Sequence, residues 1–241
     1  MFDHVTIRAS DRRASEAAYT TVLGELGIEP TYADEWFVEW GDFSLLDASD
    51  ERPATTRLHI GFVAPSRAQV DAFWHAGRAS GLTDAGAPGE RPHYKPDYYG
   101  AFLLDPDGNS VEAVHHGSLR EGGVIDHLWL RTDDLDAARR FYAVVAPSAG
   151  LRLRDLSSRH VQVVGSSGSF SVVPGPSTRG LHLAFPAATN SAVDEFHRAA
   201  TGAGHRDDGA PGERPAYHPG YYGAFVLDPE GNSVELVNHN R

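Results

Sequence analysis

Segments in which hydrophobic and polar residues alternate are separated along this chain by segments whose hydrophobic residues have helical spacing. Residues 2–9 alternate and predict a strand. The next segment predicts a helix, with Ser10 or Asp11 as its N-cap and Gly27 just past its end. Three short strands then fit residues 30–33, 35–40 and 43–47. The chain therefore opens with one predicted β-α-β-β-β module.

The same order of elements recurs along the rest of the chain. A strand at 57–64 precedes a helix that Ser66 would cap, and a Gly/Pro-rich loop over residues 81–96 leads to strands at 98–104 and 110–115. The second half of the chain repeats both modules. The predicted fold class is therefore α+β, with four β-α-β-β-β modules.

The second half of the chain is a copy of the first. Residues 86–112 (GAPGERPHYKPDYYGAFLLDPDGNSVE) align with residues 209–235 (GAPGERPAYHPGYYGAFVLDPEGNSVE), and five of these 27 positions differ. The offset of 123 residues is the size of a domain and too long for a solenoid repeat. We therefore expect two tandem domains, residues 1–118 and 122–241, with a glycine-containing linker at 116–123.

Two histidines and one glutamate recur at this same offset. The first set is His4, His59 and Glu112, and the second set is His127, His182 and Glu235. Two histidines and a carboxylate form a facial metal site with open coordination positions. Strand alternation turns each of these residues away from the hydrophobic side of its strand, so a curled sheet would gather each set in a metal cup. The alternatives are an inherited site that no longer holds metal, or buried histidines satisfied by hydrogen bonds.

These residues resemble the vicinal oxygen chelate superfamily, which holds glyoxalase I, extradiol dioxygenases and the bleomycin- and fosfomycin-resistance proteins. The opening AspHis-x-x-x-Arg at residues 3–8 and the closing AspPro-x-GlyAsnSer-ValGlu at 105–112 are typical of it, and both recur in the second half. The resemblance covers essentially the whole chain. It implies two tandem domains, each with two modules curled around a divalent metal, and a small substrate that chelates this metal.

The resemblance also bears on the metal and the reaction. Glyoxalase I enzymes carry a fourth ligand, a glutamate, on the fourth strand, where this chain has PheSerLeuLeu at 43–46 and PheSerValVal at 170–173. A three-ligand site resembles the dioxygenase branch, which favours Fe(II) or Mn(II) over Zn(II) or Ni(II). We therefore favour extradiol-type dioxygenase chemistry. The alternatives are a glyoxalase-like isomerase or lyase and a non-catalytic binding protein of the bleomycin-resistance type.

By the same resemblance, the second domain has candidate acid–base residues. His218 lies near the position of the extradiol histidine, and Phe225 takes the place of the expected tyrosine, with Tyr221 and Tyr222 close by. We expect His218 and Tyr222 to be catalytic, since an imidazole beside a metal is a suitable acid or base. Lys95 replaces His218 in the first domain, which makes one catalytic and one structural domain a further alternative.

Two other repeated features remain open. His116 and His239 follow the glutamates by four residues, and we expect them at solvent-exposed strand ends, with a role behind the metal ligands as the alternative. The GlyGluArgPro motif is most simply a conformational loop. Its arginines, Arg91 and Arg214, are alternatively anchors for an anionic substrate.

Composition narrows the function classes. The 241 residues carry a formal net charge of −12, which argues against nucleic acid as a partner. No stretch reaches the roughly 18 apolar residues of a membrane span, so we expect no membrane partner. The chain has no cysteine and no signal-peptide pattern, which fits a cytoplasmic protein. A tandem chain can pair its own domains, so we expect a monomer or a homodimer.

Overall fold

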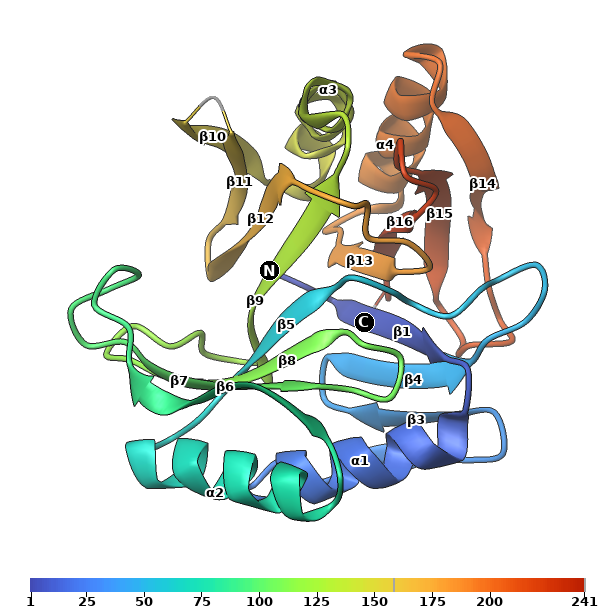
Figure 1. Cartoon of the computed structure of the whole chain (residues 1–241). Helices are drawn as coiled ribbons and strands as arrows, with labels where there is room; N and C mark the ends of the chain where they lie inside the picture. The colour runs from blue at the N-terminus through green and yellow to red at the C-terminus, as the bar shows by residue number, and fades with distance from the viewer. Residues whose placement is uncertain (158, 241) are drawn as a thin grey trace. The chain divides into compact units, whose positions relative to one another are not determined.

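The structure, a computed structural model, describes residues 1–157 and 159–240 and contains the four predicted β-α-β-β-β modules (Figure 1). The first module comprises β1 (His4–Ala9), α1 (Arg12–Gly24), β2 (Tyr32–Ala33), β3 (Phe37–Trp40) and β4 (Phe43–Asp47). The second comprises β5 (His59–Val63), α2 (Arg67–Ala79), β6 (Thr83–Glu90), β7 (Tyr99–Leu104) and β8 (Ser110–His115). The third comprises β9 (Ile125–Thr132), α3 (Leu135–Val145), the short helix η1 (Pro147–Ala149), β10 (Arg152–Ser157), β11 (His160–Gly165) and β12 (Gly168–Pro174). The fourth comprises β13 (His182–Pro186), α4 (Asn190–Gly202), β14 (Arg206–Glu213), β15 (Tyr222–Leu227) and β16 (Ser233–Asn238).

The strands form two eight-stranded sheets. Their strand orders are β14-β15-β16-β13-β1-β4-β3-β2 and β10-β11-β12-β9-β5-β8-β7-β6. The first module therefore shares a sheet with the fourth, and the second shares a sheet with the third. The predicted α+β fold of paired modules is confirmed, but the modules that share a sheet are not consecutive in sequence.

The chain divides into two compact units that exchange the beginnings of the two sequence halves. The first unit is Thr6–Trp129, and the second unit is Met1–Val5 together with Leu130–Arg241. Strands β1 and β9 thus each contribute residues to both units. The domain limits 118 and 122 that we expect from the sequence remain a prediction.

The helices form where the sequence predicts them, because each has a polar N-cap and one hydrophobic face. The Asp11 carboxylate accepts a hydrogen bond from the Ala14 amide, and Ser66 accepts one from Gln69. In the first unit, α1 and α2 pack against each other and cover one face of the strands (Figure 1). No helix in the described part of the chain is long and apolar enough to cross a membrane.

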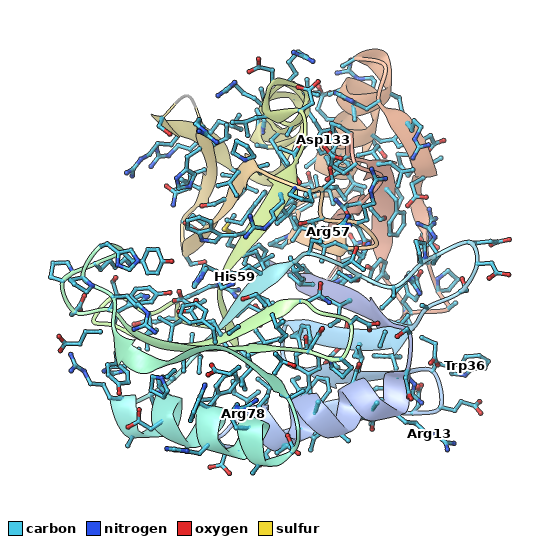
Figure 2. All side chains as sticks on the ribbon, in the orientation of Figure 1. Arg13, Trp36, Arg57, His59, Arg78 and Asp133 are labelled. Carbon is cyan, nitrogen blue, oxygen red and sulfur yellow. The ribbon has the colours of Figure 1, made fainter. Side chains whose placement is uncertain are left out.

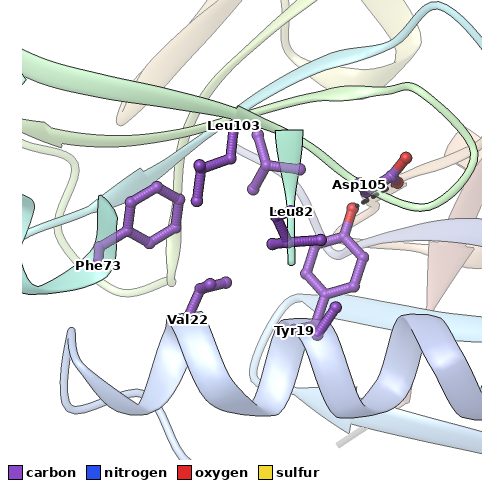
Figure 3. Close-up of a pocket in the computed structure, with 8 residues that line it drawn as sticks. Tyr19, Val22, Phe73, Leu82, Leu103 and Asp105 are labelled. Carbon is purple, nitrogen blue, oxygen red and sulfur yellow. Dashed lines mark hydrogen bonds between the residues drawn. The ribbon is translucent and has the colours of Figure 1, made fainter. Parts of the chain in front are cut away.

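Aromatic side chains fill the layer between the helices and the strands. In the first unit the ring of Tyr19 lies 5.0 Å from that of Phe43, which lies 5.1 Å from that of Phe62. Figure 3 shows a small apolar pocket in this layer, where the Tyr19 hydroxyl donates to Asp105. None of the six predicted metal ligands lines this pocket, so the candidate chemistry lies elsewhere.

The predicted loop at 81–96 is partly wrong. Its first half forms β6, which pairs antiparallel with β7 through two register shifts. The glycines and the proline suggested a loop, yet such residues are tolerated in an edge strand with bulges. Gly86 and Gly209 are also required beside β7 and β15, because a Cβ atom there would lie 2.9 and 2.8 Å from the rings of Phe102 and Phe225.

Candidate metal sites

The six predicted ligands form two three-residue groups, but not the groups that we expected. One group is His59, Glu112 and His127 in the first unit, called the His59 site below. The other is His4, His182 and Glu235 in the second unit, called the His4 site. The two halves of the sequence have exchanged their first histidine, so the predicted grouping by sequence half is wrong.

Strand pairing is the physical reason for this exchange. Strand β9 pairs antiparallel with β5, and this register places His127 opposite Gly61, two residues from His59. Strand β5 in turn pairs parallel with β8, which places Glu112 opposite the same Gly61. Strand β1 lies next to β13 in the other sheet, where the Asp3 amide donates to the Ala184 carbonyl at 2.9 Å.

The ligand atoms of the His59 site form a nearly equilateral triangle. The Nε2 atoms of His59 and His127 lie 3.1 Å apart, and Glu112 Oε2 lies 3.1 Å from the first and 3.3 Å from the second. Figure 2 labels His59 on β5. Its ring faces Trp129, with the centroids 6.4 Å apart.

The His4 site repeats this triangle. The Nε2 atoms of His4 and His182 lie 3.1 Å apart, and Glu235 Oε2 lies 3.5 Å from His4 and 3.0 Å from His182. The two sites therefore present the same three atoms at the same spacing.

This arrangement fits a divalent metal. Ligand atoms about 2.1 Å from one ion and at right angles to each other lie about 3.0 Å apart, which is close to the observed edges. The Nδ1 atoms of His4 and His127 lie 2.9 Å from Asp3 and Asp126 oxygens, so a hydrogen on Nδ1 leaves the Nε2 lone pair free for the ion. Two such lone pairs and a carboxylate oxygen repel one another unless a cation lies among them.

Each glutamate is held by a tyrosine. The side chains of Glu112 and Glu235 are each 1% exposed. Tyr98 donates to Glu112 Oε1 at 2.7 Å, and Tyr221 donates to Glu235 Oε1 at 2.6 Å. The second oxygen, Oε2, is thereby directed at the histidines, which favours a single metal–oxygen bond.

Glycines on the neighbouring strands leave room for this contact. A Cβ atom at Gly100 would lie 2.5 Å from Glu112 Oε1, and one at Gly223 would lie 2.6 Å from Glu235 Oε1. These distances are too short for any side chain. The glutamate and its tyrosine therefore occupy space that only glycine provides.

Electrostatics favour a cation at the His59 site. Burial opposes ionisation of Glu112, yet hydrogen bonds with His127 and His59 lower its pKa to about 2. Burial also opposes protonation of His127, but its bonds to Asp126 and Glu112 raise its pKa to about 9. In the metal-free chain a proton on His127 thus supplies the positive charge that a metal would supply.

One predicted catalytic residue lies away from the sites. The Tyr222 hydroxyl donates to Asp194 on α4 at 2.8 Å, on the helix side of the sheet. Tyr221, one residue earlier, is the tyrosine that contacts the site, because neighbouring residues of a strand face opposite sides. The parity of Tyr221 with Phe225 and Glu235 is the sequence signal that would have identified it, since Phe225 pairs with Glu235 in register.

His218 also lies outside the ligand group, but it is linked to it. Its Nε2 lies 2.7 Å from His239 Nδ1, and His239 Nε2 lies 2.8 Å from Asp3 Oδ2. In the first unit His116 likewise bonds to Asp126, at 3.3 Å. His116 is 3% exposed, so the expectation of a solvent-exposed strand end is wrong for it. Through Asp126 and Asp3, both His116 and His239 lie behind a candidate metal ligand.

The GlyGluArgPro arginines lie near the sites. The Arg91 guanidinium lies 5.6 Å from the Phe102 ring centre, and this ring lies 6.0 Å from that of His59. Arg214 repeats this over Phe225, which is 6.0 Å from His182. Each arginine also donates to the carbonyl of the alanine four residues earlier, at 2.7 Å. The motif is therefore both a loop-shaping element and a source of positive charge beside each site.

Comparison with known proteins agrees with this picture. The model of the Glyoxalase/Bleomycin resistance protein/Dioxygenase superfamily matches residues 1–113. No curated protein matches the chain. A glyoxalase/bleomycin resistance protein from Albidiferax ferrireducens is 36% identical over 48% of this chain and 99% of its own, with a TM-score of 0.42.

Solved structures that resemble the whole chain include a glyoxalase I and a candidate dioxygenase. Glyoxalase I from Zea mays is 18% identical, with a TM-score of 0.69 over 99% of this chain and 92% of its own. A candidate dioxygenase from Bacillus subtilis is 12% identical, with a TM-score of 0.64 over 100% of this chain and 85% of its own. At these identities the likeness shows the fold alone.

Proposed function

Because the chain belongs to the Glyoxalase/Bleomycin resistance protein/Dioxygenase superfamily, we propose that it is a divalent-metal-dependent enzyme acting on a small substrate that chelates metal through adjacent oxygens. The observation that carries this proposal is the pair of two-histidine, one-glutamate triangles with edges of 3.0–3.5 Å. Such a set leaves coordination positions open for two substrate oxygens.

The residues that would hold the metals are the two ligand groups, His59, Glu112 and His127, and His4, His182 and Glu235. Fe(II) or Mn(II) is favoured, with Zn(II) or Ni(II) as alternatives. When bound, such an ion supplies Lewis acidity to the chelating oxygens and, for iron or manganese, a route to oxygen chemistry. The chain itself fixes the ligands through Asp3 and Asp126 and directs Glu Oε2 inward through Tyr98 and Tyr221.

Extradiol-type dioxygenase chemistry is the reaction that we favour. Each ligand group among the described residues has three members and lacks a second carboxylate, which supports a three-ligand site over the four-ligand site of glyoxalase I. Phe102 and Phe225 offer apolar surface beside the metal-ligating histidines, and Arg91 and Arg214 offer positive charge behind them. These groups suit a flat, negatively charged chelator.

The test combines metal content with two activity assays. Protein purified without a metal-affinity tag is loaded anaerobically with Fe(II) or Mn(II), and oxygen uptake is followed with a set of catechols. The same protein loaded with Zn(II) or Ni(II) is offered the hemithioacetal of methylglyoxal. Glu112→Gln with Glu235→Gln should abolish activity, and His75→Ala, which alters neither group, should not.

The outcomes separate three readings. Oxygen uptake that depends on both glutamates supports the dioxygenase. Turnover of the hemithioacetal alone supports the glyoxalase-like isomerase or lyase. Two metals per chain without turnover of either kind leaves a binding protein, and no retained metal refutes the proposal.

A further inference from the structure

A line of hydrogen-bonded side chains leads from the surface to the His4 site. His218 Nε2 lies 2.7 Å from His239 Nδ1, His239 Nε2 lies 2.8 Å from Asp3 Oδ2, and Asp3 Oδ1 lies 2.9 Å from His4 Nδ1. The imidazole rings of His218 and His239 are stacked at 5.0 Å with an interplanar angle of 18°. The line ends at the surface on His218, whose Nδ1 lies 2.7 Å from the Pro219 carbonyl.

The hydrogen bonds along this line require one more proton than two neutral imidazoles carry. The Pro219 carbonyl only accepts, so His218 Nδ1 must carry a hydrogen. The Asp3 carboxylate also accepts, so His239 Nε2 must carry one. The two remaining nitrogens face each other at 2.7 Å, and two lone pairs do not approach so closely. One further proton must lie between them, which gives the pair three protons on four nitrogens and one positive charge.

The equivalent line at the His59 site needs no such proton. His116 Nε2 donates to Asp126 at 3.3 Å, and His116 Nδ1 accepts from the Ser118 amide at 3.2 Å. A neutral imidazole satisfies both contacts. The position of His218 is taken by Lys95, whose ammonium donates to the Ser118 hydroxyl at 3.0 Å.

We propose that His218 and His239 share one proton next to Asp3, and that this charge makes the two metal sites unequal. His239 and His218 act as positioning residues that set how strongly Asp3 draws the Nδ1 hydrogen of His4. The metal part of this inference rests on the proposed function, whereas the shared proton does not.

The direction of the effect follows from charge. The positive charge of the protonated pair attracts the Asp3 carboxylate and disfavours a cation at the His4 site. Without that charge Asp3 would draw the Nδ1 hydrogen of His4 more strongly and strengthen His4 as a ligand. Asp3 lies on one side of the pair, and the ring of Tyr221 lies on the other side, 5.3 Å from each imidazole. Tyr217 packs behind Tyr221. Among the described residues that contact the pair, Asp3 supplies the carboxylate, and bonds from His4 and His239 outweigh burial and lower its pKa.

The shared proton is tested in the metal-free protein. Imidazole ¹⁵N NMR at pH 7 should show three protonated nitrogens in the His218–His239 pair, and His116 should be a neutral Nε2–H tautomer. His218→Gln should return His239 to a neutral tautomer, because the amide donates to Nδ1 without adding charge. His197→Gln, which removes a surface imidazole bonded to Asp207 at 2.9 Å, should leave the pair unchanged. Two neutral imidazoles at positions 218 and 239 would overturn the inference.

The inequality of the sites is tested by Mn(II) titration followed by electron paramagnetic resonance. His59→Ala leaves the His4 site as the complete site, and the matched His182→Ala leaves the His59 site. At pH 7, Mn(II) affinity should be lower for the His4 site than for the His59 site. Adding His218→Gln should raise the Mn(II) affinity of the His4 site at pH 7 by roughly three- to tenfold.

An unchanged Mn(II) affinity of the His4 site in the His218→Gln protein would refute the inequality. If neither background binds Mn(II), the proposed function fails, and the NMR result still decides whether the proton is shared. Circular dichroism of each background confirms that the loss of one histidine has not unfolded the chain.

Discussion

Paired histidine substitutions test which residues share a metal. His4 and His182 belong to one site in the structure, although they lie 178 positions apart in sequence. The variant His4→Ala/His182→Ala should therefore lose the His4 site and keep one metal per chain. The variant His4→Ala/His59→Ala removes one ligand from each site and should keep none.

The expected loss is large enough to read as stoichiometry. Removal of a partner behind a metal ligand already costs about 10–100-fold in affinity, and removal of a ligand itself costs more. A site with two of its three ligand atoms should therefore release its metal during gel filtration. Each variant also leaves a glutamate that is 1% exposed with fewer partners, which costs about 3–5 kcal/mol in the metal-free chain.

Elemental analysis after gel filtration gives the answer, with thermal melting to confirm that each variant is folded. His75→Ala serves as the control and should keep two metals. The opposite pattern, with one metal in His4→Ala/His59→Ala and none in His4→Ala/His182→Ala, would show that each sequence half builds its own site. That result would refute the exchanged grouping.

Three further predictions follow from repeated positions and from the pKa of one ligand. Tyr19→Phe should lower the free energy of unfolding by about 1–2 kcal/mol in urea melts, because the Tyr19 hydroxyl donates to a buried carboxylate (Figure 3). Tyr142→Phe is the control and should not, because the Tyr142 hydroxyl has no partner among the described residues. Equal losses in the two variants would contradict this. Gly100→Ala should empty the His59 site alone and Gly223→Ala the His4 site alone, measured as one metal per chain, since each added Cβ would collide with a ligating glutamate. In the metal-free protein the raised pKa of His127 contributes about 3 kcal/mol to the free energy of unfolding. This contribution is complete below about pH 6.5 and is lost as pH rises through about 9. Thermal melts should therefore show stability falling over that range.

The sequence was sufficient to single out the six candidate ligands and the modules. Repetition of His4, His59 and Glu112 at one offset singled out six residues among 13 histidines and many acids. Strand alternation placed them on the face opposite the helices, and the structure brings all six into ligand groups. Both signals are local, because they depend on spacing within a strand or on the copy number of a motif.

The grouping of these ligands was not predictable from spacing. Each half of the chain carries the same three residues, so a site within one half and a site completed by the other half have the same sequence signature. The choice depends on whether β1 lies beside β5 or beside β13, which is a long-range pairing. Local pattern does not encode that pairing when both partners are copies of each other.

The error at Tyr222 has a different origin. Tyr221 and Tyr222 are adjacent, and β15 begins between them. A shift of one residue in a strand moves a side chain to the opposite face, so an uncertainty of one position in the strand boundary reversed the assignment. For His116 and His239 the sequence favoured solvent-exposed strand ends over a role behind the ligands, because no periodicity reports their bonds to Asp126 and Asp3.

The exchange of first strands has a consequence for the ancestry of this chain. A gene encoding one copy would have produced a polypeptide with three ligands that belong to two different sites. Such a polypeptide could complete a site only with a second molecule, whereas in the tandem chain each copy supplies a histidine to the other. Since then neither copy can be trimmed or replaced without depriving the other of a histidine, so the two halves must be inherited together.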